Sequence, residues 1–284
     1  DKNFKGRAIQ NMLNIESDDS VNALLRLRGL NDEEFVKSHY VVFATKNGTV
    51  KKTCLEAYSR PRANGVNAIN ILDGDEVVDV RLTNGKNEII LANRNGRAVR
   101  FDEDAVRAMG RVSTGVRGMQ LDGDDDQVVG MIIVNNADTE TVMVVSENGY
   151  GKRSQVEDYR KTNRGGKGVK TFSITEKTGR LVAIKNVTDE NDLMIINKSG
   201  IAIRLAVSDC RVMGRATQGV RLINLSKKND VIASVCKVMS SELEAKLADD
   251  QNTTGEQDAD AVQPVADNAQ NTDSTEQANT TEQE

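Results

Sequence analysis

A glycine-rich loop flanked by cations is the most specific candidate for chemistry in this sequence. It runs Arg164-Gly165-Gly166-Lys167-Gly168, with Arg160, Lys161 and Lys170 close by. Adjacent glycines let a backbone approach a phosphate closely, and flanking cations can hold the anion. The loop is not a nucleotide-binding P-loop, because no Gly-Lys-Ser/Thr run leads into a helix. It therefore predicts a phosphate contact without nucleotide chemistry.

Other basic residues recur at fixed distances from repeated glycines. Gly-Val pairs begin at Gly65, Gly115, Gly168 and Gly219, and Gly6 opens a weaker copy, giving intervals of 59, 50, 53 and 51 residues. Three series of cations stand eight before, four before and two after the last three glycines: Arg107, Arg160 and Arg211; Arg111, Arg164 and Arg215; Arg117, Lys170 and Arg221. Phased cations on equivalent elements would form one belt.

Tight hairpins must position these residues. Their turns are Asn47-Gly48, Asn95-Gly96, Asn148-Gly149 and Ser199-Gly200, and each follows a β-branched run. Asn-Gly between such runs favours a type I′ hairpin, because both central residues need positive φ. A fourth basic series stands four residues after each hairpin glycine: Lys52, Arg100, Arg153 and Arg204. The belt is completed by their neighbours Lys51 and Lys152 and by Arg60 and Arg62 in the first unit.

Each unit also contains an apolar stretch after the glycine and a second β-rich run. Four short strands per unit of about 50 residues are typical of a propeller blade. We expect an all-β, propeller-like ring over residues 1–240, with repeats near 4–60, 61–111, 112–163 and 164–215 and an incomplete one at 216–240. The sequence contains five strand-turn-strand segments but only four hairpins. We therefore expect that about one repeat, with the hairpin that closes the ring, is missing at the N-terminus of this chain. Helical periodicity is weak except at Ser241–Lys246.

A basic belt of this kind suits duplex DNA. Interleaved aromatic residues are missing, which disfavours stacking on single strands, and no base-reading helix is visible. Backbone contacts to a bent duplex remain, with sequence read weakly. The alternative is that these cations are solvated residues that protect strand edges.

The net charge of −5 is a sum over two unlike segments. Ten acidic and no basic residues lie from Asp249 to Glu284, so the other 248 residues carry 38 − 33 = +5. The segment 241–284 is predicted to be a disordered acidic tail, because its composition cannot bury enough apolar surface to offset the entropy of ordering. Such a tail could compete with DNA phosphates for the belt.

Several function classes are disfavoured. No window resembles a membrane span or signal peptide. Three cysteines without CxxC spacing suit a reducing compartment, and a single histidine, His39, makes zinc sites and most histidine catalysis unexpected. The run Asp122-Gly123-Asp124-Asp125-Asp126 lacks the glutamate of a calcium loop, so we expect no metal. The four tyrosines are expected to pack and not to act as nucleophiles.

Several segments resemble the C-terminal domain of the bacterial DNA gyrase A protein, over about residues 4 to 238. They are Lys46–Thr53, Val106–Gly110, Thr114–Gly118 and Glu147–Arg153. The resemblance implies a six-bladed β-pinwheel that exchanges hairpins between blades and wraps duplex DNA around its rim. It also implies partners, namely the rest of the gyrase A protein and the gyrase B protein in an A2B2 holoenzyme of the bacterial cytoplasm and nucleoid. That holoenzyme uses ATP and Mg to introduce negative supercoils.

The resemblance has one departure. The family's signature loop, Gln-Arg-Arg-Gly-Gly-Lys-Gly, belongs to the first blade, whereas residues 162–168 match its last five positions in a later blade. The cleavage tyrosine, the Mg-binding carboxylates and the ATP site are expected to lie outside this fragment, which needs no cofactor of its own. Two alternatives stay open: the corresponding domain of topoisomerase IV, and a propeller scaffold for protein partners. An enzyme with its site in a central channel is a weaker third.

Overall fold

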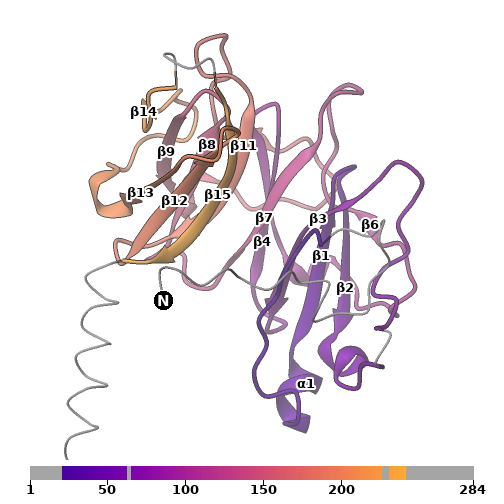
Figure 1. The fold of residues 1–284 in the computed structure, drawn as a ribbon. Helices are drawn as coiled ribbons and strands as arrows, with labels where there is room; N and C mark the ends of the chain where they lie inside the picture. The colour runs from indigo at the N-terminus through magenta and orange to yellow at the C-terminus, as the bar shows by residue number, and fades with distance from the viewer. Residues whose placement is uncertain (1–20, 63–64, 226–229, 241–284) are drawn as a thin grey trace, which may run out of the picture. The chain divides into compact units, whose positions relative to one another are not determined.

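The computed structural model describes residues 21–62, 65–225 and 230–240 (Figure 1). The chain divides into a unit at Asp1–Ser240 and a second at Ser241–Glu284. The predicted acidic tail and the predicted helical stretch at 241–246 lie outside the described residues. Within the described ranges, no helix is long and apolar enough to cross a membrane.

Four hairpins form where the sequence predicts them. They consist of β1 (Tyr40–Thr45) with β2 (Thr49–Cys54), β4 (Glu88–Asn93) with β5 (Arg97–Asp102), β8 (Thr141–Ser146) with β9 (Tyr150–Gln155), and β12 (Asn191–Asn197) with β13 (Ala202–Ala206). Each pair is antiparallel. The register leaves three residues in each loop, the last of them the turn glycine, so the predicted two-residue type I′ turn is corrected to a three-residue loop. The turn glycines have φ of 86°, 77°, 79° and 82°, the left-handed conformation that such a loop requires at its last residue.

A third strand joins each hairpin on the side of its first strand. These strands are β3 (Val77–Thr83), β7 (Val128–Val134), β11 (Leu181–Val187) and β15 (Ile232–Met239), which pair with β1, β4, β8 and β12. They are the predicted second β-rich runs. Neighbouring sheets contact one another through them, β3 with β7, β7 with β11, and β11 with β15.

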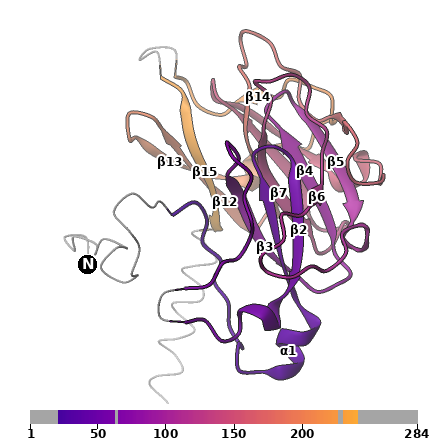
Figure 2. The same cartoon turned by 90° about the vertical axis from the view of Figure 1, so that its right-hand side faces the viewer.

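The outermost strand of a blade comes from further along the chain. The two-residue strands β6 (Val116–Arg117), β10 (Val169–Lys170) and β14 (Val220–Arg221) pair with β2, β5 and β9. Each short strand follows the hairpin of one blade in the chain but pairs with the hairpin of the preceding blade. The chain therefore crosses back to complete the preceding sheet. Figure 2 shows β6 beside β2. The Gly-Val pairs thus mark strands that are exchanged between blades.

The sheets number four in the described residues, three with four strands and one with three strands, β13-β12-β15. The expectation of about five repeats is corrected, because blades follow hairpins and not glycine anchors. Val66–Ile71, which follows the first anchor, is no strand. The equivalent strands pair with a hairpin that lies earlier in the chain, and the described residues contain none before β1.

The core is divided among the spaces between blades. Along β4, Ile89 and Leu91 belong to a cluster shared with β1 and β2, whereas Ile90 and Ala92 belong to a cluster shared with β8. Alternate residues of a strand point to opposite faces, so both faces of this sheet are buried. The near-continuous apolar runs of the sequence follow from this arrangement.

One α-helix was not predicted. Helix α1 (Glu33–Ser38) begins at Asp32, whose side chain accepts hydrogen bonds from the N–H groups of Glu34 and Phe35. It packs against the 3₁₀ turn η2 (Leu55–Tyr58) at one end of the first blade. Equivalent 3₁₀ turns, η3 (Glu103–Ala105), η4 (Val156–Asp158) and η5 (Val207–Asp209), follow the other hairpins.

The hairpin glycines also make room for the exchanged strands. The carbonyl of Gly149 accepts the N–H groups of Leu222 and Ile223, just beyond β14. A Cβ on Gly149 would lie 2.7 Å from the carbonyl oxygen of Ile223. At Gly200, in the blade to which no exchanged strand is paired among the described residues, a Cβ would meet nothing within 4 Å.

Alanine substitutions at Gly149 and Gly200 distinguish two destabilising effects. One is the backbone strain of the turn, and the other is obstruction of an exchanged strand. Both glycines have φ near 80° (79° and 82°), so alanine at either position bears the same backbone penalty, about 1–2 kcal/mol. We expect Gly149→Ala to lower the free energy of unfolding by about 2 kcal/mol more than Gly200→Ala, because only the former obstructs an exchanged strand. Urea denaturation measures both values. Equal losses would contradict this account of the repeat.

Candidate nucleic-acid interface

The second strand of each hairpin fixes a basic loop on the outside of the sheet. The N–H groups of Met109, Thr162 and Met213 donate to the carbonyls of Lys52, Arg100 and Arg153, each at 2.8 Å. Short parallel bridges at the preceding residues extend these contacts. Three loops of similar sequence are therefore held on three successive blades by the same backbone bonds.

These loops and the exchanged strands carry nine of the predicted site residues, which we call the rim cations. They are Arg107, Arg111, Arg117, Arg160, Arg164, Lys170, Arg211, Arg215 and Arg221. Six are exposed, and Arg111, Arg164 and Arg215 are partly buried. Within the described part of the chain, the side chains of the six exposed members have no hydrogen-bond or ion-pair partner. Their charge is available to an external polyanion.

Two rim cations also brace neighbouring blades. Arg164 donates to the carbonyls of Ala105 and Arg117, at 2.8 and 3.0 Å. Arg215, one repeat later, donates to the carbonyls of Asp158 and Lys170. An arginine has five N–H donors in a planar fork, so each still has donors to offer. Arg164 and Arg215 therefore connect neighbouring blades as well as adding positive charge to the rim.

The glycine-rich loop uses its backbone within the protein. The Gly165 N–H donates to the Gly118 carbonyl at 2.7 Å, and the Gly166 carbonyl accepts the N–H of Gln120. A Cβ on Gly168, whose φ is +72°, would lie 2.3 Å from the Ala98 carbonyl oxygen. At least two of the three glycines therefore serve inter-strand packing first, which the sequence interpretation did not foresee.

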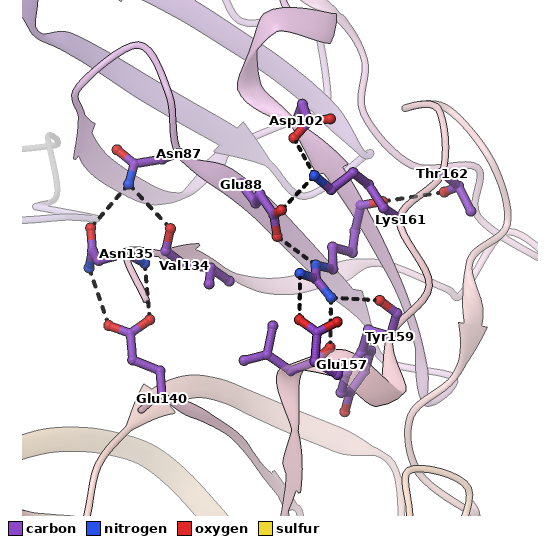
Figure 3. A network of polar contacts seen from close by, with 12 residues as sticks. Asn87, Glu88, Asp102, Val134, Asn135, Glu140, Glu157, Tyr159, Lys161 and Thr162 are labelled. Atoms are coloured by element: carbon purple, nitrogen blue, oxygen red, sulfur yellow. Dashed lines mark hydrogen bonds and ion pairs between the residues drawn. The ribbon is translucent and has the colours of Figure 1, made fainter. Parts of the chain in front are cut away.

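Lys167 and Lys161 are exposed but already hold carboxylates. Lys167 lies 2.7 Å from Asp122, and this hydrogen bond lowers the pKa of that carboxyl group. Lys161 lies 2.7 Å from Glu88 and 2.9 Å from Asp102 (Figure 3). Lys167 and Asp122 are both exposed, and exposed ion pairs contribute little to stability, so a phosphate could replace this carboxylate at little cost.

The series four residues after the hairpin glycine is corrected for three of its four members, which do not lie on an open belt. Lys52, Arg100 and Arg153 are buried, because the strands that carry them are covered on both faces. Arg100 binds Glu88 at 2.6 Å, Glu157 at 3.1 Å and the carbonyls of Val156 and Tyr159 (Figure 3).

The other members of that series make equivalent structural bonds. The ammonium group of Lys52 lies 3.6 Å from Glu103, Arg153 lies 2.6 Å from Asp189, and Arg204, although exposed, lies 2.6 Å from Asp192. Truncating a buried member would leave its partner unpaired, which is destabilising. These residues therefore have a structural role in the blades, and the three buried members are not open to a phosphate.

Lys51 and Lys152 are also buried, in carbonyl cages. Lys51 donates to the carbonyls of Ala68 and Arg111, and Lys152 to those of Gly214 and Arg215. Each ammonium group thus anchors a basic loop. Burial, and after it the charge of Arg111, lowers the pKa of Lys51 to about 8. Burial and the charge of Arg215 lower the pKa of Lys152 to about 8 in the same way.

The blade between them has a valine in place of this lysine. Val99 stands three residues after Gly96, as Lys51 and Lys152 do after Gly48 and Gly149. A cavity of about 490 Å³ lies there, lined by Val99, Arg160 and the glycine-rich loop. The loop Arg164–Gly168 therefore covers an open hollow, whereas its two counterparts rest on an ammonium group.

The remaining predicted residues lie near the first blade. Arg60 and Arg62 are exposed beside η2 and line a cavity of about 600 Å³ with Arg111.

Tyr159 is buried against Thr171, and burial raises its pKa to about 12, as suits a packing residue. Among the described residues, no group of three or more histidine, cysteine, aspartate or glutamate side chains could hold a metal ion.

Blades that exchange their outermost strand and carry cations on it define a propeller-like repeat domain with a basic rim. A family model described as the DNA gyrase C-terminal domain, beta-propeller, matches residues 39–84, 87–135, 140–188 and 191–236. Each match spans one hairpin and all or part of its third strand. The chain belongs to this family.

One relative and two solved structures are similar to this chain. The gyrase A protein of Staphylococcus aureus (strain NCTC 8325 / PS 47) is 41% identical over 250 residues, which are 88% of this chain and 28% of the relative. The C-terminal domain of DNA topoisomerase IV matches with a TM-score of 0.76 and 27% identity, over 88% of this chain and 75% of that one. A DNA gyrase A C-terminal domain matches with a TM-score of 0.72 and 23% identity, over 84% and 77%.

The buried lysines give a test of the anchored loops. Their folded pKa of about 8 lies below the ordinary 10.5, so the unfolded chain binds more protons between these pH values. Stability contributed by these groups should therefore rise as pH increases from about 8 to 10.5. We expect this rise to be smaller in Lys51→Met and Lys152→Met than in the parent, as measured by urea denaturation at several pH values. An unchanged pH slope would contradict the cages.

Proposed function

We propose that this domain binds duplex DNA around its rim and bends it, as the C-terminal domain of a gyrase A protein. The observation that carries the proposal is the repetition of rim cations on three successive blades at equivalent positions. Equal backbone geometry places equal charges at regular steps along a curved edge. A duplex presents phosphates at regular steps too, and it can meet all three loops only by following the curve.

The proposed contacts differ in how free their side chains are. The exposed cations at Arg107, Arg160 and Arg211 and those at Arg117, Lys170 and Arg221 would meet phosphates first. The partly buried residues Arg111, Arg164 and Arg215 would donate additional hydrogen bonds to the same phosphates from deeper in the rim. Arg60 and Arg62 would continue the contact on the first blade.

The whole protein's activity is part of the proposal, because the chain spans 28% of the relative's length. We infer that it works in an A2B2 holoenzyme of the bacterial cytoplasm and nucleoid. There the bent duplex would offer a second segment to the cleavage core, and ATP hydrolysis with Mg elsewhere in the holoenzyme would drive negative supercoiling. The domain itself would supply DNA geometry and no catalytic group.

Topoisomerase IV is the second candidate, favoured by the TM-score of 0.76 to its C-terminal domain. The identity of 41% to a gyrase A protein supports gyrase over it. A gyrase introduces negative supercoils into relaxed circles, so the holoenzyme's product distinguishes the two. A scaffold for protein partners would not require unpaired cations at equivalent positions of successive blades, so their presence favours DNA binding.

The rim is tested by salt dependence. We expect affinity for duplexes to climb with their length and to fall steeply between about 50 and 200 mM salt, because each phosphate contact releases counterions. The triple variant Arg117→Gln, Lys170→Gln and Arg221→Gln should flatten the log–log salt slope by about 2.7, about 0.9 for each lost contact. Fluorescence anisotropy of labelled duplexes measures both quantities.

A matched control keeps net charge out of the comparison. Lys37→Gln, Lys86→Gln and Lys198→Gln remove three exposed lysines that lie outside the rim. This variant should retain nearly the parental slope. If both triple variants lose the same slope, binding follows overall charge, and the proposed rim is wrong.

A further inference from the structure

A cavity of about 400 Å³, which we call the central cavity, lies where the third strands of all four blades meet. It is lined by Arg81 from β3, Asn135 directly after β7, Lys185 and Asn186 from β11, and Lys237 from β15. The site is distinct from the rim, because the third strands pair on the opposite side of the hairpins from β6, β10 and β14.

The cations of this cavity outnumber the carboxylates that could neutralise them. Asp79 is buried and bonded to Arg81 at 3.0 Å and to the N–H groups of Val80 and Met131. Lys185 and Lys237 have no hydrogen-bond or ion-pair partner among the described residues. Two ammonium groups thus share a wall with a guanidinium whose carboxylate is already engaged.

The other nearby carboxylate is also committed. Glu140 accepts hydrogen bonds from the backbone N–H of Asn135, at 3.0 Å, and from the side-chain amides of Asn135 and Asn186, each at 3.3 Å. Figure 3 shows the contacts between Asn135 and Glu140. Asn186 also donates to the carbonyl of Ile133 across the blade boundary. The amides fix Glu140 beside the cavity, and among the described residues it forms no ion pair with Lys185 or Lys237.

The protonation behaviour agrees with this crowding. Burial lowers the pKa of Lys185, and Arg81 lowers it further, whereas Asp79 raises it. Desolvation of the ammonium group lowers the pKa of Lys237; Glu140 opposes this, while Arg81 and Lys185 add to it. Like charges held together in a partly dry space favour a bound anion, which would restore attraction to each of them.

We propose that the central cavity binds a small multivalent phosphate anion, held by Lys185, Lys237 and Arg81. Its volume falls within the range of small-ligand sites, about 300–1,000 Å³, and cannot admit a duplex. No aromatic side chain among the described residues lines it, so a nucleobase would have no stacking partner. Inorganic pyrophosphate, with charges at two ends, matches a wall whose cations come from separate blades.

Calorimetric titration of pyrophosphate into the chain tests the site. We expect one saturable event in the parent, and a dissociation constant at least about tenfold higher in Lys185→Met with Lys237→Met, because hydrogen bonds between charged groups are lost. Malonate, a dicarboxylate, should bind more weakly.

The rim provides the control. Lys170→Gln with Arg221→Gln removes two exposed rim cations and should leave pyrophosphate affinity unchanged, even if DNA binding falls. If the double lysine variant does not fold, Lys237→Glu, at an exposed position, replaces it and should show the same loss. An unaltered dissociation constant in these cavity variants, or an equal loss in the rim variant, would overturn the proposal. So would titration without saturation.

Discussion

The exchange of outer strands between blades is the constraint on which the rest of this structure depends. Two-residue strands complete sheets whose hairpins lie more than 60 residues earlier, as with Val116 on Val50. The exchange brings each basic loop against a neighbouring blade and ties successive blades in series. It also explains why glycines recur, since Gly149 and Gly219 permit backbones to approach too closely for a side chain. Position along the rim is therefore set by backbone bonds.

The basic residues fall into two groups that alternate along the same segments. Lys52, Arg100 and Arg153 are buried and neutralised by carboxylates or carbonyls, whereas Arg107, Arg160 and Arg211 are exposed a few residues from the bonds that fix them. The buried group bears the cost of desolvation in return for strong bonds at strand ends. The exposed group keeps its donors free. A count of cations alone cannot distinguish the two.

Much of the fold was predictable because the signals are local. Asn-Gly turns between β-branched runs located the hairpins, and repeated spacing located the third strands. The number of blades was not predictable from the sequence, because it depends on which distant strand completes each sheet. Helix α1 was missed, although Asp32 followed by Glu33 and Glu34 is a recognisable start of a helix. At the site, phase was predictable, but the burial of Arg100 needed the partner sheet. Lys185 could be recognised as a candidate anion-binding residue only from the structure, which brings the third strands of four blades together around one cavity.

Cross-linking along one duplex tests most directly whether the exchanged strands arrange the rim cations as steps along a curved DNA path. A photoreactive residue would replace Arg117, Lys170 or Arg221, one at a time, and the cross-links would be mapped on a single end-labelled duplex that has one preferred binding position. We expect three separate positions on the DNA, in the order of the blades and at similar intervals. Cross-links from all three residues to the same position would contradict the account, because the blades would then not be in contact with successive stretches of one duplex.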